Sequence, residues 1–310
     1  MPLFQFQPKT SIGLDITLTT IKLIQIRHKK EKPEVTNIAF SNIESDPINT
    51  IKSLLNSIKL DSKIVNTTLS GQGVVIRYVQ LPNMTAEELN SAVKFEAEKY
   101  IPYPVNEVYL DAKIIKESYK ENKMLVLLAA AKKDLVQGRI NLLNSVGLEP
   151  AIINVSVLAV INAFNFFEPS KATLKKDEKP QPVALLNVEE NIANLSILEA
   201  SLPVFSRDII LGQREASLAT SDSSLINLAN EIRLSFDFYE SQENVPISNL
   251  FMSGSLQKTK GVDTFLNQNL GVEIKTWDPF SKLSFIPNLD KAILKDRESE
   301  FTVAIGSALR

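Results

Sequence analysis

Apolar residues in this chain alternate between short continuous runs and stripes at helical spacing, a pattern typical of an α/β protein. The clearest runs are residues 12–16 and 21–26, and a small polar turn at residues 17–20 separates them. Apolar runs of this length, bounded by turn residues, predict two buried strands. The chain is therefore expected to open with a hairpin at the centre of a mixed sheet.

Strand and helix patterns continue through the first half of the chain. Asp46 followed by Pro47 predicts a helix start, because Asp is a favoured N-cap and proline suits the first helical position. The other elements predicted here are strands at residues 34–40, 63–69 and 149–154, and a buried helix at residues 156–167.

Residues 74–146 follow a different order, strand–helix–strand–strand–helix, which predicts an inserted subdomain with its own small sheet. Its first helix begins with a capping box formed by Thr85 and Glu88. Leu89 lies on the apolar face of that helix. Phe95 and Ile101 lie outside this face, so they are apolar residues that the packing of the helix does not explain. The strands are predicted at residues 74–80, 107–115 and 124–131, with a polar turn at residues 116–123 and a helix at residues 133–146.

A polar stretch with three prolines divides the chain at residues 168–182, and its composition predicts a linker or exposed loop. The predicted organisation is a first half at residues 1–167, this linker, and a second half at residues 183–310. The second half is expected to contain strands at 203–210, 249–252 and 272–276, and helices at 221–240, 262–270 and 301–309.

The opening hairpin recurs after the linker. VALLNVEENIANLSIL aligns without gaps on SIGLDITLTTIKLIQI, which places Asn187 on Asp15, Glu189 on Thr17 and Asn194 on Lys22. Internal duplication predicts two halves built alike. Asp15 needs a partner, because a buried unpaired carboxylate is costly. It is either a turn cap that bonds its own backbone or an acid that faces a ligand beside a phosphate cradle.

Composition excludes several classes of site. The chain of 310 residues exceeds the usual size of one core. Its 34 basic and 36 acidic residues create no field that would favour nucleic acid or an anionic membrane. The absence of cysteine excludes disulfides and thiolate metal sites, and the single histidine, His28, lies beside two lysines as expected for a solvated hairpin tip. No signal peptide is expected, and the longest apolar run, residues 124–131, is too short for direct membrane insertion.

The opening hairpin is followed, along nearly the whole chain, by the stretches FEAEKYIPYP, EIRLSFDFY, LFMSGS, WDPF and AIGSALR. In this order, these segments resemble the PilM family, actin-like proteins of type IV pilus assembly that are related to FtsA. The resemblance implies an α/β actin-like ATPase fold, with two duplicated α/β halves and a small α+β subdomain inserted in the first. The lack of an amphipathic membrane helix before Arg310 favours PilM over FtsA-like proteins.

The resemblance also implies a location and partners. A PilM-like protein is expected to be cytoplasmic and peripheral at the inner membrane, where it binds the N-terminal cytoplasmic tail of a PilN-like inner-membrane protein. Pilus motor ATPases are further expected partners. Phe95, Ile101 and Tyr103 are candidates for the partner groove, and packing inside the subdomain or at the domain junction is the alternative for all three.

The nucleotide motifs of the fold are altered. The first is usually D-x-G-x-x-x-x-K, and here Asp15 and Lys22 are present but Thr17 replaces the glycine. A β-branched residue disfavours both positive φ and a close approach of the backbone to phosphate. The second motif has Asn187 for aspartate and Glu189 for glycine. A carboxylate about 4 Å from a phosphate charge costs about 4 kcal/mol at an effective dielectric constant of about 20.

The adenosine-side loop, with Gly254 and Ser255, is the least altered of the three motifs. If the chain keeps a nucleotide site, its cofactor is ATP, and Mg²⁺ binds only together with ATP. That site would consist of Asp15, Thr17, Lys22, Asn187, Glu189, Gly254 and Ser255. The favoured interpretation is a binding scaffold with no catalytic residue, no metal of its own and a degenerate nucleotide cleft. The alternatives are a slowly hydrolysing ATPase of the same machine, a small-molecule kinase of the same fold, an FtsA-like protein and an unrelated two-domain α/β protein.

Overall fold

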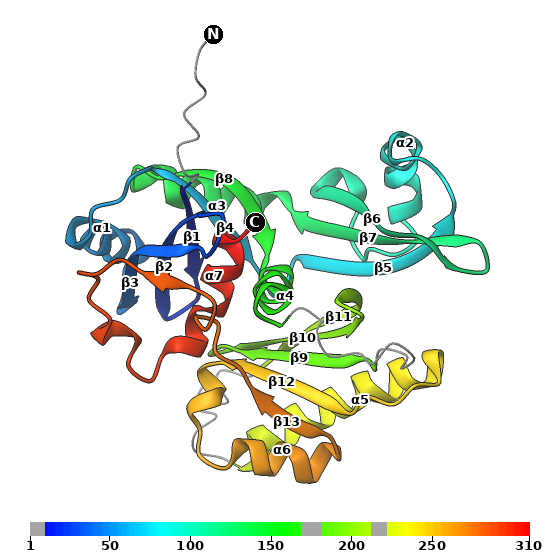
Figure 1. Ribbon diagram of the computed structural model, residues 1–310. Helices are drawn as coiled ribbons and strands as arrows, with labels where there is room; N and C mark the ends of the chain where they lie inside the picture. The colour runs from blue at the N-terminus through cyan, green and yellow to red at the C-terminus, as the bar shows by residue number, and fades with distance from the viewer. Residues whose placement is uncertain (1–9, 169–180, 212–221) are drawn as a thin grey trace.

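The computed structural model describes residues 10–168, 181–211 and 222–310, and Figure 1 shows how their elements are arranged. The predicted linker at residues 168–182 lies almost entirely outside the described residues. None of the helices in these three ranges is long and apolar enough to cross a bilayer.

The first sheet grows around the opening hairpin and has the strand order β14-β3-β2-β1-β4-β8. Helices α1 (Pro47–Ser57) and α3 (Lys133–Ser145) contribute to an apolar core on one of its faces. As predicted, Asp46 caps α1 by accepting a hydrogen bond from the backbone N–H of Ile48. The strands are β1 (Thr10–Ile16), β2 (Thr20–Arg27), β3 (Glu34–Asn42), β4 (Ile64–Leu69), β8 (Glu149–Val155) and β14 (Ser284–Phe285).

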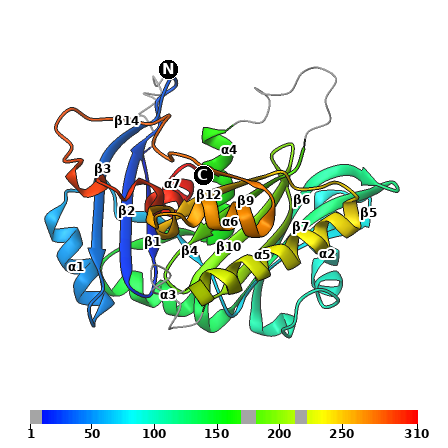
Figure 2. The same cartoon turned by 90° about the horizontal axis from the view of Figure 1, so that it is seen from below.

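The second sheet repeats the first, with the order β11-β10-β9-β12-β13. Asp15 pairs with Lys22 across the first hairpin, and Asn187 pairs with Asn194 across the second, so the gap-free alignment is confirmed in register. Helices α5 (Asp222–Glu243) and α6 (Val262–Leu270) cover one face (Figure 2). The strands are β9 (Val183–Val188), β10 (Ile192–Glu199), β11 (Leu202–Ile210), β12 (Asn249–Gly254) and β13 (Glu273–Thr276).

Two helices lie between the sheets, α4 (Ser156–Phe167) and α7 (Thr302–Ala308), and they share an apolar core with residues of both sheets. Their backbones come very close. A Cβ atom on Gly306 would lie 1.8 Å from the carbonyl oxygen of Ala159, and one on Gly13 would lie 1.9 Å from that of Ala304. The small residues of the AIGSALR segment are therefore required by packing, because α7 sits against both β1 and α4.

The third sheet, β5-β7-β6, is inserted between β4 and α3 in the chain. Helix α2 (Ala86–Ala97) packs on one face, and its capping box between Thr85 and Glu88 is present as predicted. The strands are β5 (Val74–Pro82), β6 (Val108–Lys120) and β7 (Lys123–Lys132).

Two local predictions need correction. The polar stretch at residues 116–123 is not a long turn, because β6 continues to Lys120 and only Glu121 and Asn122 form the turn, with φ of 49° and 56°. Polar residues do not end a strand that has one solvated face. Strand β14 was not predicted, because a two-residue edge strand has no periodicity to detect. Short 3₁₀ helices complete the chain: η1 (Val105–Glu107), η3 (Ser255–Lys258), η4 (Ala292–Leu294) and η5 (Glu298–Phe301).

Candidate functional site

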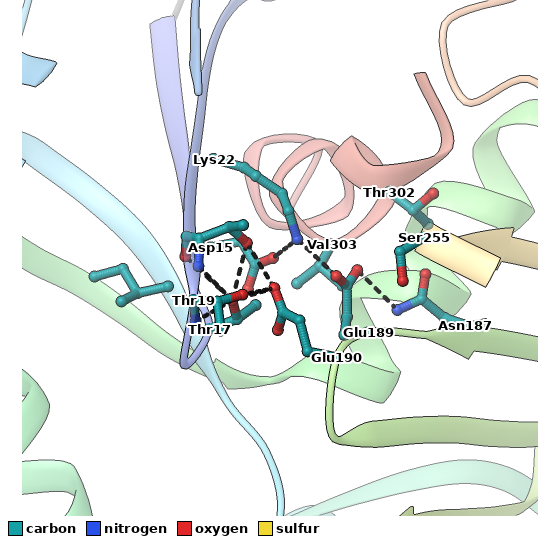
Figure 3. Close-up of polar contacts among 12 residues, drawn as sticks. Asp15, Thr17, Thr19, Lys22, Asn187, Glu189, Glu190, Ser255, Thr302 and Val303 are labelled. Carbon is teal, nitrogen blue, oxygen red and sulfur yellow. Dashed lines mark hydrogen bonds and ion pairs between the residues drawn. The ribbon is translucent and has the colours of Figure 1, made fainter. Parts of the chain in front are cut away.

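The turns of the two hairpins face each other, one from each half, as Figure 3 shows. We call residues 17–20 the first turn and residues 189–191 the second turn. Both close with the same backbone hydrogen bond: the N–H of Thr17 donates to the carbonyl of Thr20 at 3.0 Å, and the N–H of Glu189 donates to that of Ile192 at 2.9 Å. The duplication thus extends to the backbone geometry of the candidate site.

A buried lysine joins the two turns. The ammonium of Lys22 lies 3.2 Å from Oδ2 of Asp15, its partner across the hairpin, and 2.8 Å from Oε2 of Glu189 in the other half. Lys22 has an exposed fraction of 0%, and both carboxylates are buried as well. Asp15 is therefore a member of a buried ionic cluster rather than a turn cap, and Glu189 pairs with a cation instead of facing an empty cradle.

Glu190 makes the second connection between the turns. Its Oε1 accepts hydrogen bonds from Oγ1 of Thr17 at 3.1 Å, from Oγ1 of Thr20 at 3.1 Å, and from Oγ1 of Thr19. Its buried Oε2 has no hydrogen-bond partner among the described residues. All the hydrogen bonding of this carboxylate therefore comes from the first turn.

Three backbone amides of the first turn, those of Thr17, Thr19 and Thr20, are bonded within the turn. Oγ1 of Thr17 accepts the backbone N–H of Thr20 at 3.0 Å and that of Thr19 at 3.4 Å. Thr17 is not among the residues with positive φ, so threonine replaces glycine here without backbone strain. Since a phosphate cradle needs free amides, the Thr17 hydroxyl occupies two N–H groups that a phosphate would otherwise use.

The other candidate residues bond to one another. Oδ1 of Asn187 accepts a hydrogen bond from Ser253, at 2.8 Å, and Ser255 donates to the carbonyl of Val188 at 3.0 Å. Gly254 has φ of +84°, and a Cβ atom there would lie 2.2 Å from the Val188 carbonyl oxygen. This glycine therefore serves the close pairing of β9 with β12.

Arg139 is a neighbour of the cluster that the sequence did not indicate. It reaches from α3 and donates to the carbonyl oxygen of Ile16 and to Oγ1 of Thr67, both at 3.2 Å. Burial lowers the pKa of its guanidinium, and the charge of Asp15 acts in the opposite direction. Only the fold brings it here, because α3 is separated from the hairpin by the whole inserted sheet.

The cluster has more acids than bases, and this is reflected in the pKa of Glu189. Burial raises the pKa of Glu189 from its ordinary value of 4.5 to about 7, although Lys22 lowers it. Burial would lower the pKa of Lys22, but Glu189 and Asp15 together hold it well above its ordinary value. Since Lys22 stays charged, Glu189 is the member that exchanges a proton near neutral pH.

We expect Glu189 to make the folded state less stable as pH rises from about 5 to about 8. Between pH 4.5 and about pH 7, the Glu189 carboxyl binds a proton in the folded state but not in the unfolded state. The stabilisation that this proton supplies is complete below pH 4.5 and is lost as the pH rises above about 7. The loss is on the order of 2 kcal/mol. Urea unfolding of Glu189→Gln across this range should show a stability gain over the native chain that grows with pH.

The matched control for this experiment is Glu231→Gln. Glu231 forms an ion pair with Arg207 on the exposed surface of the second half, and neither residue belongs to the buried cluster. The free energy of unfolding of this variant should change with pH in parallel with that of the native chain. Parallel profiles for Glu189→Gln as well would contradict the proton assignment.

The structure separates the three residues expected in a partner groove. Phe95 on α2 is 75% exposed, whereas Ile101 is only 7% exposed and belongs to the core between α2 and the third sheet. Tyr103 packs partly against the same core. Ile101 therefore packs inside the subdomain, which was the alternative for all three residues. The role of Phe95 and Tyr103 in partner binding stays a prediction.

A groove does exist on the opposite face of the third sheet. Its volume is about 720 Å³, and its walls are β6, β7, β8, α4, the turn between β10 and β11, and the last two residues. Its floor is largely apolar, and Tyr109, Asp111 and Lys113 of β6 contribute to it. No residue pattern marks this groove in the sequence, because seven separate stretches of the chain contribute to it, including Leu69 of β4 and Val136 of α3.

The residues between the turns do not fit a bound triphosphate. The backbone N–H groups of Thr19 and Thr20 are bonded to Thr17, the lysine is bonded to two carboxylates, and Glu190 accepts from the three hydroxyls. The carboxylates of Glu189 and Glu190 lie between the turns, and a phosphate charge beside them would be repelled strongly. In the described ranges, no group of three or more His, Asp or Glu side chains is placed to hold a metal ion.

Comparison with known proteins agrees with the fold and the motifs. The family model described as type IV pilus assembly protein PilM matches residues 13–220 and 224–310. A solved structure described as a PilM-PilN type IV pilus biogenesis complex is similar, with a TM-score of 0.83 and 24% identity, over 98% of this chain and 99% of that one.

A Bacteroides thetaiotaomicron protein described as having an actin-like ATPase fold and unknown function is a more distant match. Its TM-score is 0.51 and its identity 9%, over 89% of this chain and 94% of that one. These similarities confirm the predicted actin-like fold, with its two duplicated α/β halves.

Proposed function

The chain belongs to the PilM family of type IV pilus assembly proteins, and on this basis we propose that it is an adaptor of such a machine. It binds the N-terminal cytoplasmic tail of a PilN-like inner-membrane protein and thereby lies in the cytoplasm, peripheral to the inner membrane. Through that tail it would connect the membrane complex with pilus motor ATPases. It does not hydrolyse ATP.

The groove beside the third sheet is the observation that carries this proposal. A volume of about 720 Å³ suits several side chains of an extended peptide. A similar structure is described as a complex of PilM with PilN. A largely apolar floor with a few polar groups is what a peptide needs for affinity and orientation.

An unsatisfied acceptor in the groove wall supports a peptide as the ligand. Asn165 of α4 donates to the carbonyl oxygen of Ser201 at 2.9 Å, but its buried Oδ1 has no hydrogen-bond partner within the described ranges. A buried acceptor without a donor is costly. A backbone N–H of a bound tail would supply that donor.

Tyr109→Asp should weaken binding of the tail by about tenfold or more, because an aromatic anchor in an interface is worth over about 1–2 kcal/mol. Tyr109 lines the groove and is 52% exposed, so the change should not disturb folding. The measurement is fluorescence anisotropy with a labelled synthetic peptide of the PilN-like tail.

Phe95→Asp is the matched control for that experiment. Phe95 is more exposed than Tyr109 but lies on the helix that covers the other face of the sheet. The affinity of the Phe95→Asp variant for the tail should equal that of the native chain. If Phe95→Asp abolishes binding and Tyr109→Asp does not, the tail binds on the α2 face and the groove assignment is wrong.

Calorimetric titration with ATP and magnesium should give no saturable heat, and a phosphate-release assay should give no turnover above buffer. The reason is that the ammonium of Lys22, the threonine hydroxyls and the backbone N–H groups of Thr19 and Thr20 are all bonded to the chain itself. Tight binding with turnover would contradict the proposal and favour the alternative, a slowly hydrolysing ATPase of the same machine.

A further inference from the structure

The contacts between the two turns connect residues that are far apart in the chain. Lys22 and Glu189 are separated by 167 positions, and Thr17 and Glu190 by 173. Each contact pairs a donor of the first hairpin with a carboxylate of the second turn. A lysine and three converging hydroxyls form an anion-binding arrangement, and here two carboxylates of the same chain occupy it.

We propose that Glu189 and Glu190 are built-in anions that take the place of bound phosphate and fasten the two halves together without a nucleotide. This inference extends the proposed loss of hydrolysis at the same site. The two halves stay in one closed arrangement, because the anions that hold them together are part of the chain.

Hydrogen bonding and burial support this assignment. Glu190 accepts from all three threonines of the first turn through one oxygen, so an incoming anion would have to displace three hydrogen bonds. Glu189 is buried against Lys22, which leaves that ammonium no free position for phosphate. Opening would separate Glu189 from the buried ammonium of Lys22 and break the hydrogen bonds of Glu190, and both losses oppose it.

The contacts of Glu189 and Glu190 with the first hairpin also affect the groove. One side of the groove is formed by β8 and α4 of the first half, and another by residues 201–203 of the second half. Fixing the distance between the halves therefore fixes the width of the groove. A chain with built-in anions keeps the groove in one shape at any concentration of ATP.

The distance between the halves can be measured by pulsed electron paramagnetic resonance. The chain has no cysteine, so Lys52→Cys in α1 and Gln268→Cys in α6 provide two unique, exposed labelling sites. The labelled chain should give one narrow distance distribution, unchanged by millimolar ATP and magnesium. Introducing Glu189→Ala and Glu190→Ala together should broaden it and move it to longer distances.

Glu231→Ala is the control variant for this measurement. Glu231→Ala removes a carboxylate whose partner, Arg207, is in the same half, so its distribution should match that of the parent. The double variant retains the Lys22–Asp15 pair, so no buried charge is left without a partner. A parent distribution that shifts with ATP overturns the proposal even if the double variant does not fold, and so does a folded double variant with an unchanged distribution. Neither readout depends on turnover or on tail binding, so the proposed function can fail separately.

Discussion

Replacing Lys22 with methionine should lower the free energy of unfolding by about 3–5 kcal/mol, the cost of removing one partner of a buried ionic cluster. The ammonium of Lys22 lies 3.2 Å from Asp15 and 2.8 Å from Glu189, and the side chain is fully buried. Methionine fills the same volume, so the loss reports the charge rather than a cavity. Two carboxylates would then remain buried beside each other with no ammonium between them.

Urea unfolding followed by the fluorescence of Trp277 measures this effect. Trp277 is the single tryptophan of the chain and is buried in the core between the sheets. The control is a triple variant that combines Lys22→Met with Asp15→Asn and Glu189→Gln. It should recover most of the lost stability, because it leaves no unpaired charge in the cluster. A loss below about 1 kcal/mol for Lys22→Met alone, the range of an exposed pair, would show that the cluster is solvated.

Gly306→Val should lower the free energy of unfolding by about 3 kcal/mol or more, or prevent stable folding, because overpacking a close contact displaces whole elements. A Cβ atom at this position would lie 1.8 Å from the carbonyl oxygen of Ala159, which is backbone and cannot rotate away. Helix α7 would have to move off α4, and with it off β1, where Gly13 makes the matching close contact.

Gly138→Ala is the control for this substitution. Gly138 lies in α3, and nothing is within 4 Å of a Cβ atom built there. Alanine should therefore stabilise the chain by about 0.5–1 kcal/mol through its higher helix propensity. The measurement is the midpoint of urea unfolding for both variants. Equal midpoints would mean that α4 and α7 can separate at little cost, contrary to the packing observed.

Local signals in the sequence predicted most elements correctly. Asp46 and Pro47 marked the start of α1, and Thr85 and Glu88 marked that of α2, because capping chemistry acts within one turn of helix. The duplicated hairpins were found because side-chain alternation along a strand survives in the sequence. Where the periodicity was weak or absent, as in β14 and the end of β6, the prediction was wrong or missing.

The candidate site was predicted in part. Asp15, Lys22, Asn187 and Glu189 were identified by alignment of the two hairpins, and the structure brings them together. The roles of Glu190 and Arg139 were not predicted, since the contacts of these residues involve partners in distant segments. Phe95, Ile101 and Tyr103 were the candidates for partner binding, and that assignment stays a prediction; the hollow on the other face of the sheet was not predicted, because seven separate stretches of the chain meet there.

The sequence by itself determined the duplicated hairpins, the helix starts, the inserted sheet and the loss of the glycines expected at the two turns. These features depend on periodicity and capping, which act between residues close in the chain. Only the tertiary structure decided that Lys22 is shared by Asp15 and Glu189, that Glu190 takes the hydroxyls of the first turn, and that α7 packs through Gly306 against α4. The physical reason is that a buried charge must find its partner wherever the fold places one, and that partner can be any number of residues away in the chain.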